Sequence, residues 1–394
     1  MTQKTSRRDF LSAGLSAGLT LPVAGAGTKM GFFNPAGTAA PETAATPVKL
    51  DYKVLGRTGL KVTTVGMGCM ITSDPSVVEQ ALDAGINYFD TARGYQHGNN
   101  ERMVGAALGA KRKQIVLSTK TEAPDKAGMQ RHLEESLREL NTDYIDIWYL
   151  HGKSSADEIH DDMIEMQQLA RQQGKIRFAG VSTHSGQQQL LPWMAQKGAF
   201  DVVLCAYNFA MDPGMEQAIA TAAKAGLGVV AMKVMAGGIR SVRPGDPMYP
   251  KLTQPGALLA ALKWVVNKPN VATTVPSMTD RDQLEENLKA MGSPLAAHDE
   301  KLLAAHLEMI RPVYCRMCGA CSGACRKGLP VADMLRCLTY ADGYGQFALG
   351  RERFLELAAG RTGAGCANCT GCTVECPHGV HVAERLERAQ ELFG

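Results

Sequence analysis

Residues 51–311 alternate short β-branched runs with amphipathic stretches of helical length, and this pattern restricts the fold more than any other feature of the chain. In the amphipathic stretches, apolar residues recur every three or four positions, which is the spacing of one buried helix face. The strand-like runs lie at 63–68, 87–92, 114–120, 144–150, 176–183, 201–207, 228–233 and 271–275. Eight strand–helix units in about 260 residues predict an α/β fold of the (β/α)8 type, a TIM barrel.

The alternative to a barrel is a doubly wound sheet. It is less favoured because no G-x-G-x-x-G sequence follows an early strand. Before the first strand-like run, residues 51–62 predict a β-hairpin whose turn uses Gly56 and Gly59.

Four polar residues lie at or just after the predicted carboxyl ends of neighbouring strands. Asp90 lies in the second strand-like run and Tyr95 in the loop after it, while Lys120 ends the third run and His151 follows the fourth. In a barrel the carboxyl ends of the strands meet at one mouth, so these four residues are expected to converge there. Taken singly, Asp90 and Lys120 also fit a buried structural ion pair, and His151 also fits a core histidine.

Three segments resemble the tetrad motifs of the aldo-keto reductases: GINYFDTARGY at 85–95, LSTK at 117–120 and IWYLHG at 147–152. The resemblance covers most of the predicted barrel, and it implies hydride transfer between a nicotinamide and the carbon of a small carbonyl or alcohol substrate. Tyr95 is then expected to supply the proton. A phenol has a pKa of about 10, and a nearby Lys120 would lower that pKa. Asp90 would hold Lys120 in place, and His151 would orient the substrate carbonyl.

The same resemblance implies a bound NAD or NADP. The expected contacts are Gln283, Glu286 and Asn287 on the adenine side and Ser182 and Thr183 at the nicotinamide end. Two positions depart from the family pattern, because Leu204 stands where a glutamine is common and Met232 where an aromatic residue often stacks. The choice between NAD and NADP therefore stays open.

Eight of the eleven cysteines form two identical C-x2-C-x2-C-x3-C frames in residues 312–394. The first frame is Cys315, Cys318, Cys321 and Cys325, and the second is Cys366, Cys369, Cys372 and Cys376. This spacing is typical of thiolates that bind a 4Fe–4S cluster. Zinc is the main alternative, and disulfides fit less well because cysteines this close would form strained bonds. We predict two 4Fe–4S clusters in a small, mostly helical ferredoxin-like domain.

In two-cluster ferredoxins the fourth cysteine of each frame ligates the other cluster. By that resemblance, Cys376 joins the first three cysteines of the first frame, and Cys325 joins the first three of the second. The predicted domain includes helices at 331–343 and 350–360. The other cysteines, Cys69, Cys205 and Cys337, lie in apolar runs and are expected to be buried hydrophobic residues.

Residues 1–45 resemble a twin-arginine export signal with its linker, because the pair Arg7–Arg8 precedes a weakly apolar stretch that contains Pro22. A disordered basic arm is the alternative. The signal implies a periplasmic protein that is exported after folding, and no stable membrane span is expected in the mature chain. The predicted barrel then covers residues 46–311 and the cluster domain residues 312–394.

The net charge of +3 gives no indication of nucleic acid as a partner. Two functions fit the pattern as a whole. The first is an aldo-keto reductase-like oxidoreductase, acting on CH–OH or C=O groups, whose iron–sulfur domain exchanges electrons with a redox partner protein. The second is an electron-transfer module, non-catalytic or independent of nucleotide, built on a degenerate barrel. Leu204 and Met232 motivate the second hypothesis.

Overall fold

A computed structural model describes residues 49–237, 256–357, 366, 369 and 371–394. The chain divides into two units, residues 1–46 and 47–394, and all described residues belong to the second unit. The predicted export signal lies outside the described residues. Within the part of the chain that the structure describes, no helix is both long enough and apolar enough to cross a membrane.

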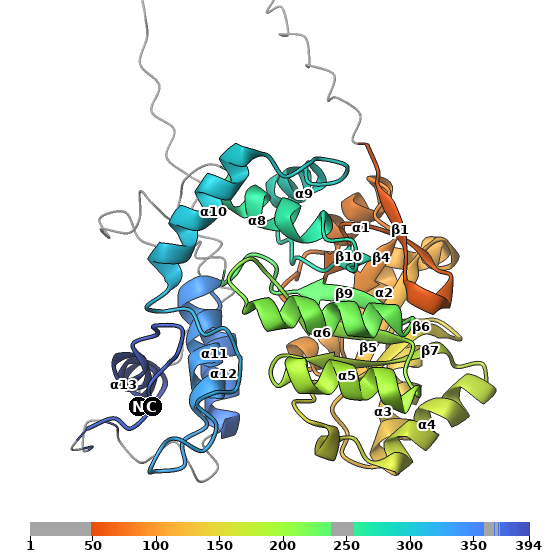
Figure 1. Cartoon of the computed structure of the whole chain (residues 1–394). Coiled ribbons are helices and arrows are strands. Elements are labelled where there is room, and N and C mark those ends of the chain that lie inside the picture. The colour runs from red at the N-terminus through yellow and green to blue at the C-terminus, as the bar shows by residue number, and fades with distance from the viewer. Residues whose placement is uncertain (1–48, 238–255, 358–365, 367–368, 370) are drawn as a thin grey trace, which may run out of the picture. The chain divides into compact units, whose positions relative to one another are not determined.

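The core of the second unit is a sheet of eight parallel strands, β3 to β10, each paired with the next in chain order (Figure 1). Bridges from Val65 to Thr274 and from Gly68 to Ser277 join the first strand region to the last. The predicted barrel is therefore confirmed. The strands are β3 (Met67–Gly68), β4 (Tyr88–Asp90), β5 (Val116–Thr121), β6 (Ile145–Leu150), β7 (Ile176–Thr183), β8 (Val202–Ala206), β9 (Gly228–Met232) and β10 (Thr273–Thr274).

Amphipathic helices cover the outside of the barrel, and their buried faces carry the apolar residues of the periodic pattern. Figure 1 shows two of them, α5 and α6, side by side over the strands. The barrel helices are α1 (Pro75–Asp83), α2 (Asn99–Leu108), α3 (Lys126–Glu139), α4 (Asp161–Gln172), α5 (Gln187–Lys197), α6 (Pro213–Lys224), α8 (Ala257–Val266) and α9 (Arg281–Leu288).

The predicted hairpin closes the amino-terminal end of the barrel. Strand β1 (Tyr52–Val54) pairs antiparallel with β2 (Lys61–Thr63), and the turn between them places Leu55 among the side chains that fill the barrel interior. Gly56 has a φ of 51°, and a Cβ there would lie 2.3 Å from the backbone nitrogen of Gly228. Only glycine fits this turn without strain, because it lacks the Cβ that would collide.

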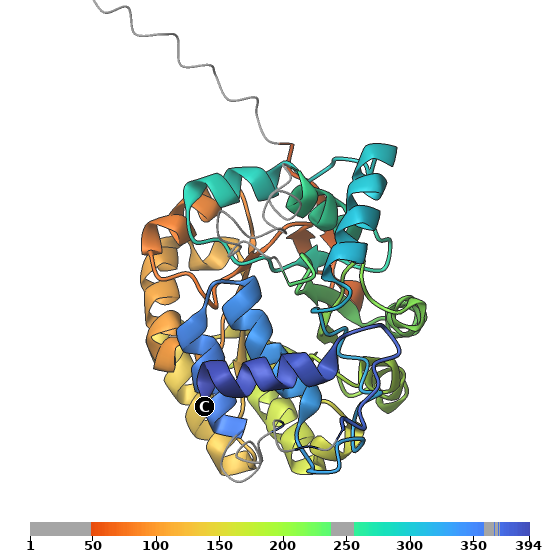
Figure 2. The ribbon, with the colours of Figure 1, turned by 90° about the vertical axis from the view of Figure 1, so that its left-hand side faces the viewer.

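Helix α10 (Ala297–Ile310) leads into a helical domain with a separate apolar core. The domain contains α11 (Val331–Leu338), a π-helical turn at Thr339–Gly343, α12 (Phe347–Leu357) and α13 (Val382–Phe393). The first two helices match those predicted from the sequence, whereas α13 was not predicted. Figure 2 shows these helices in blue against one side of the barrel, with the carboxyl terminus at the end of α13.

Candidate active site at the barrel mouth

A hydrogen-bonded chain of three polar side chains, buried Asp90 and Lys120 and half-buried Tyr95, lies at the carboxyl end of β4 and β5. The Nζ of Lys120 lies 2.6 Å from Oδ2 of Asp90 and 3.1 Å from the phenol oxygen of Tyr95. The same ammonium donates to the backbone carbonyl of Thr91, and Ser118 Oγ donates to Oδ1 of Asp90 over 2.7 Å. Every donor position of the Lys120 ammonium is therefore occupied.

Strand register explains why these residues meet. Asp90 pairs with Ser118 across β4 and β5, and Lys120 lies two positions farther along β5. Side chains two positions apart point to the same face of a strand, so Ser118 and Lys120 both face Asp90. Asp90 is 4% exposed and Lys120 is 1% exposed. The carboxylate and the ammonium thus form a buried ion pair, and the ammonium also donates a hydrogen bond to the phenol of Tyr95.

Burial dominates the acidity of the phenol. It raises the pKa of Tyr95 to about 12, although the positive charge of Lys120 acts in the opposite direction. Burial alone would lower the pKa of Lys120, but Asp90 and Tyr95 outweigh it and raise the pKa. The contribution of Lys120 to Tyr95 has the sign expected from the sequence, but the net shift is upward because the phenolate would be desolvated.

His151 follows β6 and lies against the same phenol. Its ring meets that of Tyr95 edge-on, with centroids 5.8 Å apart, and its Nδ1 lies 2.9 Å from Oε1 of Glu122. Burial lowers the pKa of His151 despite this contact, so the ring is neutral at pH 7. The contact with His151 lowers the pKa of Glu122 to about 2, so Glu122 is ionised.

Glu122 is a site residue that the sequence analysis missed. Its position in the sequence indicated the site, because Glu122 lies two positions after Lys120, just beyond the carboxyl end of β5 at the barrel mouth. An ionised carboxylate next to Nδ1 favours the neutral tautomer in which Nδ1 carries the proton. Nε2 is then unprotonated unless the ring is charged. Glu122 therefore belongs to the group of side chains that set the orientation of His151.

These residues line one cavity of about 670 Å³, which we call the mouth cavity. The barrel contributes Asp90, Tyr95, Glu122 and His151 to its wall. A further part of the wall comes from the helical domain: Arg336, Tyr340, Tyr344, Gln346, Leu349, Glu352 and Arg353. The helical domain is therefore a structural part of the mouth, which the sequence did not indicate.

The residues expected to hold a nucleotide are only partly brought to this cavity. Gln283 lines it, and the buried Nδ2 of Asn287 has no hydrogen-bond partner within the protein. Glu286, on the same helix, is part-buried and does not line the cavity. An amide left without a partner fits a group that a bound ligand would satisfy.

At the nicotinamide end, Ser182 and Thr183 lie at the carboxyl end of β7 with their side chains buried. The hydroxyl of Ser182 accepts a hydrogen bond from the backbone N–H of Gly152, and that of Thr183 donates to the carbonyl of Ser185. Both hydroxyls are thus already engaged. Leu204 is fully buried inside the barrel, whereas Met232 lines the mouth cavity.

The cysteines of the two frames fall into two neighbouring sets. Burial raises the pKa of Cys315 to about 12, and the nearby thiols of Cys321, Cys318 and Cys376 raise it further. Burial likewise raises the pKa of Cys366, with added effects from Cys325, Cys369 and Cys372. We call Cys315, Cys318, Cys321 and Cys376 the first cysteine set, and Cys325, Cys366, Cys369 and Cys372 the second. Each set takes its fourth member from the other frame.

Among the residues described, no three histidine, cysteine, aspartate or glutamate side chains are arranged so that they could hold a metal ion. The donor chemistry of the two sets nevertheless fits iron–sulfur clusters, because each set consists of four thiols. The raised pKa values of Cys315 and Cys366 also mean that these two thiols stay protonated near neutral pH unless a metal centre stabilises the thiolates.

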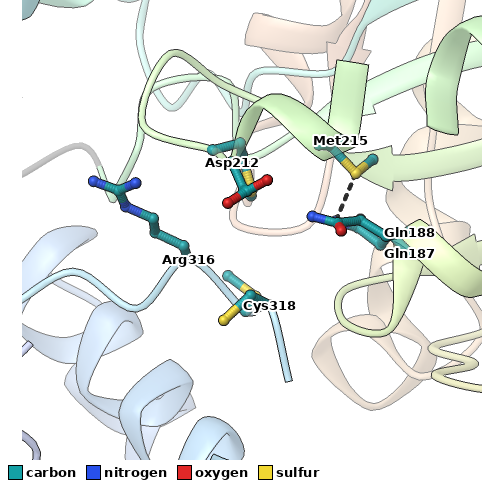
Figure 3. Close-up of a pocket in the computed structure, with 8 residues that line it drawn as sticks. Gln187, Gln188, Asp212, Met215, Arg316 and Cys318 are labelled. Carbon is teal, nitrogen blue, oxygen red and sulfur yellow. Dashed lines mark hydrogen bonds between the residues drawn. The ribbon is translucent and has the colours of Figure 1, made fainter. Parts of the chain in front are cut away.

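Cys318 of the first cysteine set lies beside the barrel helices α5 and α6. Figure 3 shows a small pocket lined by Cys318 and Arg316 together with Gln188 and Asp212. Just before the frame, the phenol oxygen of Tyr314 accepts a hydrogen bond of 2.9 Å from Asn208 Nδ2. In the second set, Cys372 is exposed. Each set therefore has one exposed thiol, Cys318 in the first and Cys372 in the second, and Cys318 also lines the pocket beside α5 and α6.

Comparison with known proteins agrees with the fold. A profile of the Aldo/keto reductase family matches residues 73–256. The apo form of aldo-keto reductase AKR11C1 from Bacillus halodurans is 30% identical, with a TM-score of 0.54, over 66% of this chain and 96% of its own. The chain belongs to the aldo/keto reductase family.

Two Bacillus subtilis proteins are further relatives of this aldo/keto reductase. The uncharacterized oxidoreductase YqkF is 28% identical over 64% of this chain and 95% of its own length. The uncharacterized oxidoreductase YrpG is 30% identical over 48% of this chain and 68% of its own. The chain is accordingly an aldo-keto reductase-like oxidoreductase. The family profile ends before the first cysteine frame.

Proposed function

We propose that this aldo/keto reductase interconverts a small carbonyl compound and its alcohol by hydride transfer, with Tyr95 as the acid and base. The observation that carries the proposal is the hydrogen-bonded chain from Tyr95 through Lys120 to Asp90, which lies on the wall of a cavity large enough for a substrate. A phenol, an ammonium and a carboxylate in this order can deliver a proton and stabilise the charge that remains.

The residues of the chain would act as follows. Tyr95 donates its phenol proton to the carbonyl oxygen during reduction and accepts a proton from the alcohol in the reverse direction. Lys120 stabilises the phenolate that forms, and Asp90 keeps the ammonium in place. Neutral His151, with its Nδ1 held by Glu122, has an unprotonated Nε2, which would accept a hydrogen bond from the alcohol hydroxyl in the oxidation direction. NAD or NADP, when bound, supplies the hydride, and the amides of Gln283 and Asn287 would hold its adenine side.

We further propose that the first and second cysteine sets each hold a 4Fe–4S cluster, which transfers single electrons. Each set has one exposed thiol, Cys318 or Cys372, where a redox partner protein would make contact, and the position of Cys318 favours the first set as the one nearer the barrel. Export of the folded protein to the periplasm by the twin-arginine route belongs to the same proposal, and it rests on the sequence of residues 1–45.

A second function is favoured by a specific observation. Leu204 is buried among apolar side chains and Met232 lines the mouth cavity, so neither residue supplies the amide or the aromatic ring that the family pattern has at these positions. The barrel would then act in electron transfer without turning over a nucleotide.

Turnover of a reduced nucleotide separates the two functions. We expect protein purified under anaerobic conditions to oxidise NADH or NADPH in the presence of aldehydes and ketones, with one alcohol formed per nucleotide consumed. Mass spectrometry of the purified protein would identify any nucleotide it retains. Reduction of the clusters without alcohol formation, or failure to bind either nucleotide, would favour the electron-transfer module instead.

The high pKa of Tyr95 predicts the pH dependence of carbonyl reduction. The reaction needs the protonated phenol, and burial raises the pKa of Tyr95 to about 12. We therefore expect kcat/KM to stay level from pH 7 to about 10, because the acid form persists across that range. A steady-state pH profile measures this, with circular dichroism at each pH to verify the fold. A basic limb with its midpoint at pH 8 or 9 would contradict the assignment.

A further inference from the structure

The helical domain brings positive charge to the mouth cavity. Arg336 and Tyr340 come from the segment of α11 and its π-helical extension, and Arg353 comes from α12. These residues lie beyond the stretch that the family profile matches.

The barrel adds a third cation to this wall. Lys233 directly follows β9, in a backbone conformation with a φ of 55°, and lines the same cavity. Its Nζ lies 4.9 Å from the ring centre of Tyr340 and 5.6 Å from that of Tyr344. The faces of aromatic rings attract a cation without neutralising it. The ammonium is thus held in position on the cavity wall.

Carboxylates on the cavity wall are largely committed elsewhere. Asp90 is bound to Lys120, Glu122 contacts His151, and Oε1 of Glu352 lies 3.9 Å from Nε2 of His97. Arg336 and Arg353 form ion pairs of 3.0 Å with Asp333 and 2.9 Å with Glu356, one helical turn away and outside the cavity lining. Pairs of this kind, with one partner exposed, are weak and screened by solvent. Both guanidinium groups can therefore interact with a ligand.

Two neutral groups near these cations respond to their charge. Burial lowers the pKa of His184, and the charges of Lys233 and Arg336 lower it further, so this imidazole is neutral. Burial would raise the pKa of Tyr340, but Lys233, Arg336 and Arg353 outweigh it and lower the pKa. The positive potential in this part of the cavity therefore exceeds the effect of desolvation, and it would attract an anion.

We propose that Lys233, Arg336 and Arg353 form an anion-binding site that takes the carboxylate of an oxo-acid substrate while its carbonyl group lies at Tyr95. The proposal deepens the proposed function and rests on it. Tyr340 stands between the two groups, since it neighbours Lys233 and lies close enough to Tyr95 for their charges to interact. A carboxylate accepts paired hydrogen bonds from a guanidinium group, which fixes its orientation as well as its position.

The position of Arg353 favours the substrate over the nucleotide as the source of the anion. Arg353 interacts with Glu122, the residue that contacts His151, so it lies at the end of the cavity where the substrate oxygen is expected. Gln283, by contrast, belongs to α9, which carries the expected adenine contacts. A nucleotide phosphate bound to the three cations remains an outcome that the following test detects.

Binding of an acid and its ester tests the proposal on the full, cluster-loaded chain. Phenylglyoxylate and methyl phenylglyoxylate share a skeleton but differ in charge, and calorimetry gives the dissociation constant of each without requiring turnover. We expect wild-type protein to bind the acid more tightly, and Arg353→Gln and Lys233→Met each to weaken acid binding about tenfold or more, because a charge-assisted hydrogen bond is lost. Ester binding should change less than twofold.

Arg351→Gln is the matched control, since Arg351 is an exposed arginine on the same helix and does not line the cavity. It should leave acid binding unchanged. Equal affinity of wild-type protein for acid and ester would overturn the proposal, as would a loss of NADPH affinity in Arg353→Gln with acid binding retained. If the acid binds through these cations but no carbonyl is reduced, the anion site stands and the proposed reductase function fails.

Discussion

A Tyr95→Phe variant is expected to lose between about 10² and 10⁴ of the kcat/KM for carbonyl reduction, which is the usual contribution of a positioned general acid. The phenyl ring keeps the edge-on contact with His151, so the change removes only the hydroxyl that lies 3.1 Å from Lys120. Nucleotide binding should be unaffected. Steady-state kinetics with the nucleotide and a carbonyl substrate measure the loss.

Tyr52→Phe serves as the control for this variant. Tyr52 is 37% exposed and lies in the hairpin at the opposite end of the barrel, so removal of its hydroxyl should leave the kinetics unchanged. A Tyr95→Phe protein that retains full carbonyl-reducing activity would show that another group donates the proton. Tyr340 would then be the next phenol to test, because it lines the same cavity.

Substitution of one cysteine in each set is expected to have the largest effect on the iron content of the protein. Two 4Fe–4S clusters correspond to about eight iron atoms per chain, and the Cys318→Ser, Cys369→Ser double variant should retain few of them and lose its visible absorption. Each single variant should lose one cluster. Iron analysis and electron paramagnetic resonance of the reduced protein measure both effects.

The exchange of the fourth cysteine between frames adds a sharper test. Because Cys376 neighbours Cys315 and Cys325 neighbours Cys366, Cys376→Ser should alter the same resonance signal as Cys318→Ser. Cys325→Ser should alter the same signal as Cys369→Ser. Cys337→Ala is the control, since this cysteine is buried in the apolar core of the helical domain. A colourless wild-type protein that contains zinc would refute the cluster assignment.

The barrel could be predicted from the sequence because the residue pattern of each strand and helix lies within a short segment of the chain. Each strand-like run has its own β-branched residues, and eight repeats of strand and helix leave few alternatives. The meeting of Asp90 with Lys120 also followed from local facts, since both stand near the carboxyl ends of adjacent strands. Spacing likewise defined the two cysteine frames, whereas the cross-frame sets came from the resemblance to two-cluster ferredoxins. In the structure, the thiols near Cys315 include Cys376, and those near Cys366 include Cys325.

The placement of the helical domain could not be predicted in the same way. Its position depends on contacts between residues far apart in the chain, such as the hydrogen bond from Asn208 to Tyr314 and the ring contacts of Lys233 with Tyr340. No periodic pattern in the sequence indicates such contacts. The net rise in the pKa of Tyr95 also depends on how completely the phenol is buried, which the motif around it does not reveal.

The shared wall of the mouth cavity has a practical consequence for dissecting this protein. Arg336, Tyr340 and Arg353 belong to a segment that would be removed by truncating the chain after the last barrel helix. A barrel expressed alone would keep its proton donor but open its cleft to bulk water on that side. Kinetic constants measured on such a fragment would not apply to the whole protein, so the barrel and the helical domain have to be assayed as one polypeptide.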